Sequence, residues 1–435
     1  MALSRRAFLT WSGLGIASVL TLDPLRLLSS RLAQGKAFET LRYGPLLPDP
    51  QGILDLPEGF AYKVISRTGD PMSDGHPVPG APDGMAAFAQ ADGSIVLVCN
   101  HELSPAQTPA VLGPNAYDRA CPGGTTTLVV NRDRQLVKQY SSLVGTCRNC
   151  AGGPTPWGSW ISCEEDVSMP GQHAVRRPHG YNFEVPASAQ EPVVPEPLRA
   201  MGRFNHEAVA IDPKTGIVYQ TEDRVDGLFY RFIPQSPENL AAGGRLEALK
   251  IRQQPQAITR TGFQVGQSHS VEWVAIDQPD PPTDTVRQEG FQKGAAQFSR
   301  GEGLVYADGS LYLTCTDGGP NRTGQIWRYL PGSHPEEGGT LSLFVEPNQQ
   351  EILDFPDNIT VAPFGDLFVC EDGASDQYLR GVDAQGHLYP FARNALNNSE
   401  FAGVCFSTDP LTMFVNLQHP GLTLAIWGEF ERRPA

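Results

Sequence analysis

The sequence predicts an all-β fold, a β-propeller of about six blades that forms a single domain behind an N-terminal export signal. Its 45 glycines and 38 prolines, with only 19% charged residues, favour many short strands and turns, because both residue types disrupt helix interiors. The second observation is an internal repeat in which an acid, an apolar strand, a turn, a second strand and another acid follow one another. Units this short cannot bury their own apolar faces, so they must pack side by side around an axis.

The charge of the chain argues against one broad class of function. The net charge is −15, and a protein this acidic is not expected to bind nucleic acid. Clustered carboxylates would instead bind cations, although a solvated acidic surface gives the same net charge.

Residues 1–33 are predicted to be an export signal. Ser4–Leu9 is a twin-arginine sequence, and a mildly apolar stretch follows from Leu9 to Leu22. This stretch is shorter than the roughly 20 residues that a membrane-spanning helix needs. We therefore expect the twin-arginine export machinery as a partner, a periplasmic or secreted location, and no stable membrane span.

After the signal, residues 34–60 form a predicted lead-in rich in proline and leucine, and residues 61–435 form the predicted propeller domain. The repeat is clearest in three stretches of that domain, residues 206–223, 302–317 and 357–372. The leading and trailing acids are 15 residues apart in the second and third stretches and 16 apart in the first. This spacing suits a hairpin that carries both acids at the same end.

Three looser units complete the predicted ring. Residues 83–102 and 400–419 show the same order of features, and a further strand ends at Cys163. In a propeller the inner strand ends converge on the central channel, so acids at equivalent hairpin ends would face one another. The acids predicted to meet there are Glu102, Glu164, Glu207, Asp223, Glu302, Asp357 and Glu400.

So many carboxylates in one funnel would repel one another strongly, so more than one multivalent cation is expected beside them. Ca²⁺ suits a site made of oxygen ligands alone. Some acids of the repeat are expected to cap turns on the rim instead, Glu165 and Asp166 first.

The stretch Trp157–Asp166 adds a soft ligand to this hard set. A short apolar strand ends on the thiol of Cys163, which three carboxylates follow directly. A thiolate beside carboxylates suits a transition metal with a harder ion nearby, which makes Cys163 a candidate metal ligand. The alternative is a buried structural cysteine followed by a solvated acidic loop.

Other cysteines and two histidines carry weaker signals. The chain has eight cysteines, and Cys147 and Cys150 form its only Cys-x-x-Cys pair, which does not complete a zinc site by itself. We expect a local disulfide or buried thiols there. His101 and His206 each precede a predicted ligand, and we expect them to support or pack against the site rather than bind metal.

Arg300 is a candidate for binding an anion. It lies two residues before Glu302, and residues two apart on an extended segment share a face, so both would look into the same pocket. An arginine beside a cation cluster can hold a phosphate or carboxylate with two hydrogen bonds. A plain ion pair with a neighbouring glutamate is the alternative.

Several motifs together resemble the PhoX-type alkaline phosphatases, a family of exported bacterial proteins. The motifs run through nearly the whole chain behind the signal: Asn100–Glu102, Asn149–Glu165, His179–Glu184, Gly202–Glu207, Arg300–Glu302 and Asn416–Gly421. The twin-arginine signal is a further shared feature. The chain is considerably shorter than the phosphatases of that family, which leaves its substrate specificity open.

This resemblance implies a six-bladed propeller with Fe³⁺ and Ca²⁺ at its axis. It implies Cys163 as an iron ligand, with Glu207 and Glu302 as carboxylate ligands of the iron part. It also implies that Arg300 binds the substrate phosphate. The remaining ligands of the cluster would be Glu102, Glu164, Asp223 and Glu400, whereas Asp357 rests on the repeat alone.

The function predicted from the sequence is that of an exported metal-dependent phosphatase acting on phosphate monoesters. The metals would polarise the phosphoryl oxygens and supply the nucleophile, and no Gly-x-Ser-x-Gly or Walker-type sequence offers a competing mechanism. One alternative is a calcium-dependent lactonase or esterase propeller, which needs no thiolate ligand. Another is a non-catalytic extracytoplasmic propeller that binds a sugar, peptide or ion. The sequence leaves the oligomeric state open.

Overall fold

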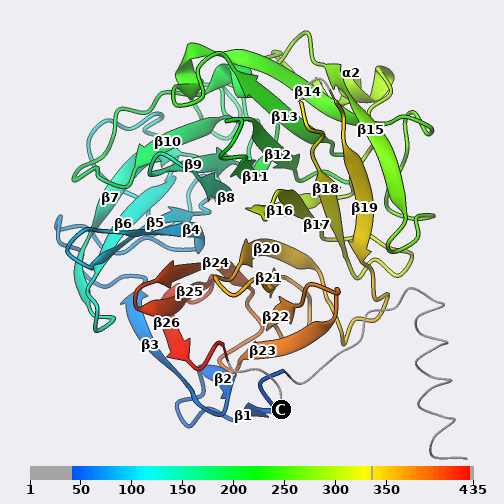
Figure 1. Ribbon diagram of the computed structural model, residues 1–435. Coiled ribbons are helices and arrows are strands. Elements are labelled where there is room, and N and C mark those ends of the chain that lie inside the picture. The colour runs from blue at the N-terminus through cyan, green and yellow to red at the C-terminus, as the bar shows by residue number, and fades with distance from the viewer. Residues whose placement is uncertain (1–41, 335–336, 432–435) are drawn as a thin grey trace, which may run out of the picture.

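The computed structural model describes residues 42–334 and 337–431, so the predicted export signal lies outside the described residues. The strands form five hydrogen-bonded sheets around a central axis (Figure 1), and one of these sheets, with nine strands, contains two blades, so the ring has six blades. Helical structure in the described part is limited to α2 (Val286–Gln292) and two short 3-10 turns, η1 (Arg199–Met201) and η2 (Leu240–Ala242). The predicted all-β propeller is therefore confirmed. No helix in the described ranges has the length and apolar character needed to cross a membrane.

The first three blades follow one another along the chain. Their strands are, for blade 1, β4 (Pro82–Ala89), β5 (Ile95–His101), β6 (Gly123–Val130) and β7 (Leu136–Thr146); for blade 2, β8 (Asn149–Pro154), β9 (Ser159–Glu164) and β10 (Asn182–Pro186); and for blade 3, β11 (His206–Ile211), β12 (Val218–Glu222), β13 (Phe229–Pro234) and β14 (Gly244–Ile251).

The last three blades complete the circle. Their strands are, for blade 4, β16 (Gly301–Ala307), β17 (Ser310–Cys315), β18 (Gln325–Leu330) and β19 (Thr340–Val345); for blade 5, β20 (Pro356–Val361), β21 (Leu367–Glu371), β22 (Tyr378–Val382) and β23 (Leu388–Asn394); and for blade 6, β24 (Phe401–Thr408), β25 (Leu411–Leu417), β26 (Leu422–Gly428) and β3 (Phe60–Arg67).

Blade 6 closes the ring, because its outer strand β3 comes from the N-terminal side of the chain and pairs with β26 from the C-terminal side. β1 (Leu46–Leu47) and β2 (Leu54–Pro57) lie in the predicted lead-in, and β2 extends the outer edge of blade 5 by pairing with β23. β15 (Ser268–Ala275) pairs with both β14 and β19, so blades 3 and 4 share one hydrogen-bonded sheet.

The core is divided among the contacts between blades. Each of the six larger apolar clusters lies mainly between two neighbouring blades, and the inner strands β4, β8, β11, β16, β20 and β24 each contact the next around the axis. Trp327, for example, is fully buried in the cluster of blades 3 and 4. Truncating such a side chain to alanine typically costs about 3–5 kcal/mol.

Every inner strand has a register irregularity near its start, where a β-bulge redirects the side chains. Glycines just past this point allow adjacent inner strands to approach closely. A Cβ on Gly84 would lie 2.7 Å from Ala151 Cα, and one on Gly303 would lie 2.5 Å from the carbonyl oxygen of Asp357. The starts of the inner strands are therefore packed around a narrow axis.

Candidate metal centre

One backbone hydrogen bond recurs in all six blades and defines equivalent positions. It runs from the N–H of the residue that follows the second strand, here called the exit position, to the carbonyl oxygen of the residue before the inner strand, here called the lead position. The exit positions are Glu102, Glu165, Asp223, Thr316, Asp372 and Gln418. Their partners at the lead positions are Ala81, Arg148, Asn205, Arg300, Phe355 and Glu400.

A third set of equivalent positions lies two residues after each lead position, at the irregular start of the inner strand. These bulge positions are Asp83, Cys150, Glu207, Glu302, Asp357 and Ala402. Five of the six carry an acid or a thiol. The ring of blades thus brings side chains from distant parts of the sequence to one end of the axis.

Ligand-type atoms from these positions form a continuous group, here called the axial cluster. Its atoms fall into three overlapping sets, each within 4.8 Å: Cys150, Glu165 and Glu207; Glu207, Glu302 and Asp357; and Asp357, Asp372 and Glu400. Asp83, Glu102 and Asp223 lie beside it and interact electrostatically with its members. The sets share Glu207 and Asp357, so they describe one site.

Burial makes the negative charge of this site costly. It raises the pKa of Asp83 to about 8, with a further contribution from Glu102. It also raises the pKa of Glu165 to about 8, although Arg148 opposes the shift. For Glu207 and for its neighbours in the cluster, burial together with the surrounding acids holds the pKa well above the ordinary range. Full ionisation therefore requires cations.

Cys150 adds a thiol to this group of carboxylates. Burial and the nearby Glu207 and Glu165 hold the pKa of this thiol well above its usual value. Its Sγ is 3.3 Å from the carbonyl oxygen of His206. Only a metal ion in the same group would favour the thiolate, so the donor chemistry fits a transition metal at this corner of the site.

Two arginines at equivalent lead positions neutralise part of the cluster. Arg300 donates from Nε and Nη2 to the two carboxylate oxygens of Asp223, at 2.9 and 3.0 Å, and from Nη2 to Glu302 at 2.8 Å. Arg148 donates from Nη2 to Glu102 at 2.8 Å and to Glu165 at 2.5 Å. Within the described part of the chain, Nη1 of either arginine has no hydrogen-bond partner, so each retains a donor for a ligand.

Most residues predicted from the sequence meet at this site. The structure brings Glu102, Glu207, Asp223, Glu302, Asp357, Glu400 and Arg300 to the same end of the axis. Of the two adjacent acids that end β12, Asp223 binds Arg300. Glu222 is buried elsewhere and accepts a hydrogen bond of 2.7 Å from the hydroxyl of Tyr230.

Cys163 and Glu164 are not part of the axial cluster. Cys163 is buried in the apolar cluster between blades 2 and 3, beside residues such as Ile161, and it interacts electrostatically with Glu207 without joining any of the three sets of ligand atoms. Glu164 Oε1 is 2.6 Å from His179 Nδ1, and both side chains are fully buried. Because successive strand residues face opposite sides, it is Glu165, predicted to cap a rim turn, that reaches the axis.

The residues of this site that are absent from the predicted set are Asp83, Arg148, Cys150, Glu165 and Asp372. Signals were available for four of them. Asp83 and Asp372 are end acids of the repeat stretches 83–102 and 357–372, and Arg148 precedes Cys150 by two residues just as Arg300 precedes Glu302. All eight cysteines are free and buried, and Cys147 and Cys150 lie in different surroundings.

The two histidines beside predicted ligands have backbone partners. His101 binds the carbonyl oxygen of Gly80 at 2.8 Å, and His206 binds that of Gly202 at 3.0 Å. Burial lowers the pKa of His101 to about 4 and that of His206 to about 3, so both are neutral at physiological pH.

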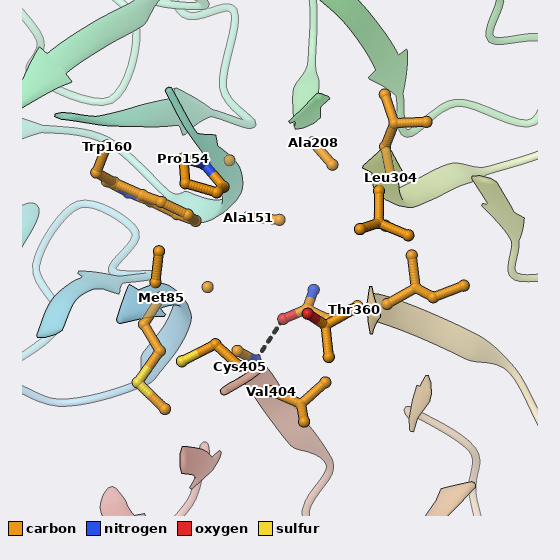
Figure 2. Close-up of a pocket in the computed structure, with 17 residues that line it drawn as sticks. Met85, Ala151, Pro154, Trp160, Ala208, Leu304, Thr360, Val404 and Cys405 are labelled. Atoms are coloured by element: carbon orange, nitrogen blue, oxygen red, sulfur yellow. Dashed lines mark hydrogen bonds between the residues drawn. The ribbon is translucent and has the colours of Figure 1, made fainter. Parts of the chain in front are cut away.

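Beyond the axial cluster, the channel becomes apolar. Figure 2 shows side chains of several inner strands around a narrow cavity. Its labelled lining residues are Met85, Ala151, Pro154, Trp160, Ala208, Leu304, Thr360, Val404 and Cys405. The cluster therefore borders mostly apolar side chains on this side, and such low-dielectric surroundings strengthen electrostatic interactions.

Comparison with known proteins identifies a family and a solved structure with a similar fold. The family model described as alkaline phosphatase PhoX matches residues 41–421. The solved structure of Pseudomonas fluorescens PhoX in complex with vanadate, a transition state analogue, superposes with a TM-score of 0.71 at 19% identity, covering 91% of this chain and 98% of that one. No curated protein matches the sequence.

Other solved structures are more distant. An inactive variant of virginiamycin B lyase from Staphylococcus aureus has a TM-score of 0.41 at 11% identity, covering 84% of this chain and 99% of that one. A gluconolactonase from Xanthomonas campestris has a TM-score of 0.38 at 12% identity, covering 88% and 97%. At these TM-scores neither bears on the function of this chain.

Proposed function

The chain belongs to the alkaline phosphatase PhoX family, and we propose that it hydrolyses phosphate monoesters at an iron and calcium centre formed by the axial cluster. The observation that carries this proposal is the convergence of one buried thiol and many buried carboxylates at equivalent positions of the blades. Burial of such a group in its ionised form is stable only when cations accompany it.

The donor set suggests how the metals would be divided. Cys150, Glu165 and Glu207 combine a soft thiolate with carboxylates, which suits iron. Asp357, Asp372 and Glu400 offer oxygen alone, which suits Ca²⁺. Glu207 and Glu302 would then be shared along the cluster. This assignment moves the iron-binding thiolate from Cys163, where the family resemblance suggested it, to Cys150.

When bound, the metal ions supply positive charge that polarises the phosphoryl oxygens and acidifies water. The protein's own contribution to binding the phosphate would come from its arginines. Arg300 is anchored by two hydrogen bonds to Asp223, so its free Nη1 is held in a defined direction at the cluster. A guanidinium positioned in this way stabilises equatorial phosphate oxygens without reorganisation during the reaction.

Arg148 would play the corresponding role at the thiolate side. It is held by Glu102 and Glu165, and its exposed fraction of 35% is close to the 29% of Arg300. Two arginines on different blades would therefore face one phosphate from two sides. Neither residue supplies a nucleophile, which the metal-acidified water would provide.

We also propose that residues 1–33 direct export by the twin-arginine route and are then removed. Because this route moves folded proteins, the metals would enter before export. The mature protein would act in the periplasm or outside the cell on small phosphate esters.

The test combines metal analysis with activity of Arg300→Ala. Wild-type protein should contain iron and calcium and should hydrolyse a phosphomonoester. Arg300→Ala should keep its metals while kcat/KM falls about 100-fold, since one preorganised charged donor contributes a few kcal/mol. Arg132→Ala, which breaks an exposed ion pair with Asp409, is the matched control and should be unaffected.

The outcomes separate the alternatives. Calcium without iron, together with turnover of a lactone or carboxylic ester, would favour a calcium-dependent hydrolase. A full metal load with no turnover of any phosphate ester would favour a non-catalytic propeller. An unchanged kcat/KM in Arg300→Ala would remove Arg300 from the mechanism.

A further inference from the structure

A second group of ligand-type side chains lies between blades 1 and 2, outside the axial cluster. One ligand atom each of Asp118, Cys121 and His179 lies within 4.8 Å of the others, and all three residues are buried. His179 Nε2 is 3.3 Å from Cys121 Sγ and 3.6 Å from Asp118 Oδ2. Cys147 packs beside Cys121 in a small buried cluster that also contains Val175.

The imidazole of His179 is oriented by a carboxylate behind it. Glu164 Oε1 is 2.6 Å from Nδ1, and Glu164 is itself fixed by three backbone N–H groups. Metal-binding histidines usually have such a carboxylate on the far nitrogen, because it fixes the ring and makes the ligand nitrogen more basic. The Nε2 atom is left facing the other members of the group.

The carboxylate of Asp118 still has room for one more partner. It accepts backbone hydrogen bonds from Ala120, Arg176 and Arg177. A carboxylate has about four acceptor positions, so roughly one remains. The backbone bonds also hold the side chain in place, which reduces the entropy lost when a ligand binds.

We propose that Asp118, Cys121, Cys147 and His179 bind one zinc ion that joins blades 1 and 2. Zn²⁺ favours four ligands of this kind, and sites closed by four protein side chains are structural rather than catalytic. Val175 and the ring of Tyr117, whose centroid is 5.4 Å from that of His179, close the site.

The site has a route for loading and a place in the architecture. Cys121 lines a surface hollow together with Arg119 and Ala120, which gives an ion access from outside. Cys147 begins the turn that carries Arg148 and Cys150 to the axis. The zinc ion would therefore stabilise the turn at the axial cluster without touching the substrate.

The experiment measures zinc, iron and calcium per chain in the purified full-length protein and in single variants. Cys121→Ser should lose about one zinc per chain and retain its iron and calcium. Cys150→Ser should retain its zinc and lose iron, because its thiol belongs to the axial cluster. Cys405→Ser is the matched control, since this buried thiol lies in an apolar cluster and should not affect any metal.

Cobalt substitution gives a second readout that does not depend on the yield of one variant. Protein loaded with Co²⁺ should show visible bands of a tetrahedral site with thiolate ligands. These bands should persist in Cys150→Ser and disappear in both Cys121→Ser and His179→Gln. Phosphatase activity per folded molecule should be unchanged in Cys121→Ser, so failure of this site is distinguishable from failure of the proposed phosphatase.

Two results would overturn the zinc site. One is an equal zinc content in wild type and Cys121→Ser. The other is a disulfide between Cys121 and Cys147 in the isolated protein, found by peptide mapping without reductant, because oxidised sulfurs could not serve as thiolate ligands.

Discussion

Three pairs of adjacent acids end the second strands of blades 2, 3 and 5, and the two members of each pair have different surroundings. The first member of each pair binds fixed partners of the protein, whereas the second reaches the axis. The pairs are Glu164 and Glu165, Glu222 and Asp223, and Glu371 and Asp372. We call the first members the inter-blade acids. The second members, together with the other carboxylates at the axial cluster, are called the axial acids; these others are Asp83, Glu102, Glu207, Glu302, Asp357 and Glu400.

The inter-blade acids have complete sets of protein partners. Glu371 accepts a hydrogen bond from Arg380 at 2.9 Å and others from the backbone N–H groups of Asp354 and Tyr378. Burial still raises its pKa to about 7, although Arg380 opposes the shift. A carboxylate with this many fixed donors has no need of a metal, so its role is structural.

The axial acids share far fewer donors. Arg148 and Arg300 form ion pairs with some of these acids. Several other buried carboxylates of the axial cluster have no ion pair with an arginine or lysine in the described structure. The comparison shows that acid content alone does not mark a metal site. What marks it is buried acid in excess of the fixed donors around it.

The largest expected effect separates the two buried thiols of blade 2. Cys150→Ser should lose iron and reduce kcat/KM by about 10³-fold, equivalent to roughly 4 kcal/mol of transition-state stabilisation. Cys163→Ser should keep its metal content, because this thiol lies among apolar side chains. Metal analysis and steady-state kinetics on both variants make the measurement, and iron loss confined to Cys163→Ser would reverse the assignment.

A large effect on stability is expected among the inter-blade acids. Arg380→Met leaves Glu371 buried without its main partner, so the free energy of unfolding should fall by about 3–5 kcal/mol. Activity per folded molecule should persist. Chemical denaturation monitors the change, with Arg132→Met at the surface as a control. Loss of metal without loss of stability would mean that this pair serves the active centre.

Adding Glu371→Leu to Arg380→Met provides a further check. Because the double variant no longer buries an unpaired charge, it should recover much of the lost stability.

The fold was predictable from the sequence because its repeat is periodic. Leading and trailing acids at nearly constant spacing predict hairpins that carry both acids at the same end. Such hairpins, repeated around a ring, predict that these acids converge on an axis. This reasoning is enough to place Glu207, Glu302 and Asp357 together, although 150 residues separate the first from the last.

The choice between neighbouring residues was not predictable in the same way. A shift of one residue reverses the side of a strand, so Glu164 and Glu165 could not be distinguished without the register of β9. For the same reason the sequence pointed to Cys163, because the acids follow it directly. It did not point to Cys150, which occupies a bulge position. A bulge is a local departure from alternation, and simple patterns do not reveal it.

Because of the axial acids, removing the metals should reverse the direction in which the free energy of unfolding changes with pH. In metal-free protein, burial raises the pKa of Asp83 and Glu165 to about 8, compared with about 4 in an unfolded chain. The folded state then binds more protons, so the free energy of unfolding should fall as pH rises from about 4 to about 8. The slope is about 1.4 kcal/mol per pH unit for each proton bound.

Metal-loaded protein should show the opposite slope, because bound ions need ionised carboxylates and proton competition weakens as pH rises. Urea denaturation across this pH range, with and without a chelator, provides the comparison. Parallel curves would indicate that the axial acids do not hold metal.

The smallest expected effect distinguishes two arginines at equivalent lead positions. Arg300 donates from Nε and Nη2 to the two separate oxygens of Asp223, whereas Nε and Nη2 of Arg148 both donate to one oxygen of Glu102, the Nε bond at 3.2 Å. The side chain of Arg148 is therefore less rigidly aimed at a substrate, and Arg148→Met should raise KM by about fivefold, or roughly 1 kcal/mol, with little change in kcat. Arg300→Met, the matched variant on blade 4, should lower kcat as well. Equal effects of the two substitutions on kcat and KM would show that both arginines hold the transferring phosphate alike, and the difference in their anchoring would then have no catalytic meaning.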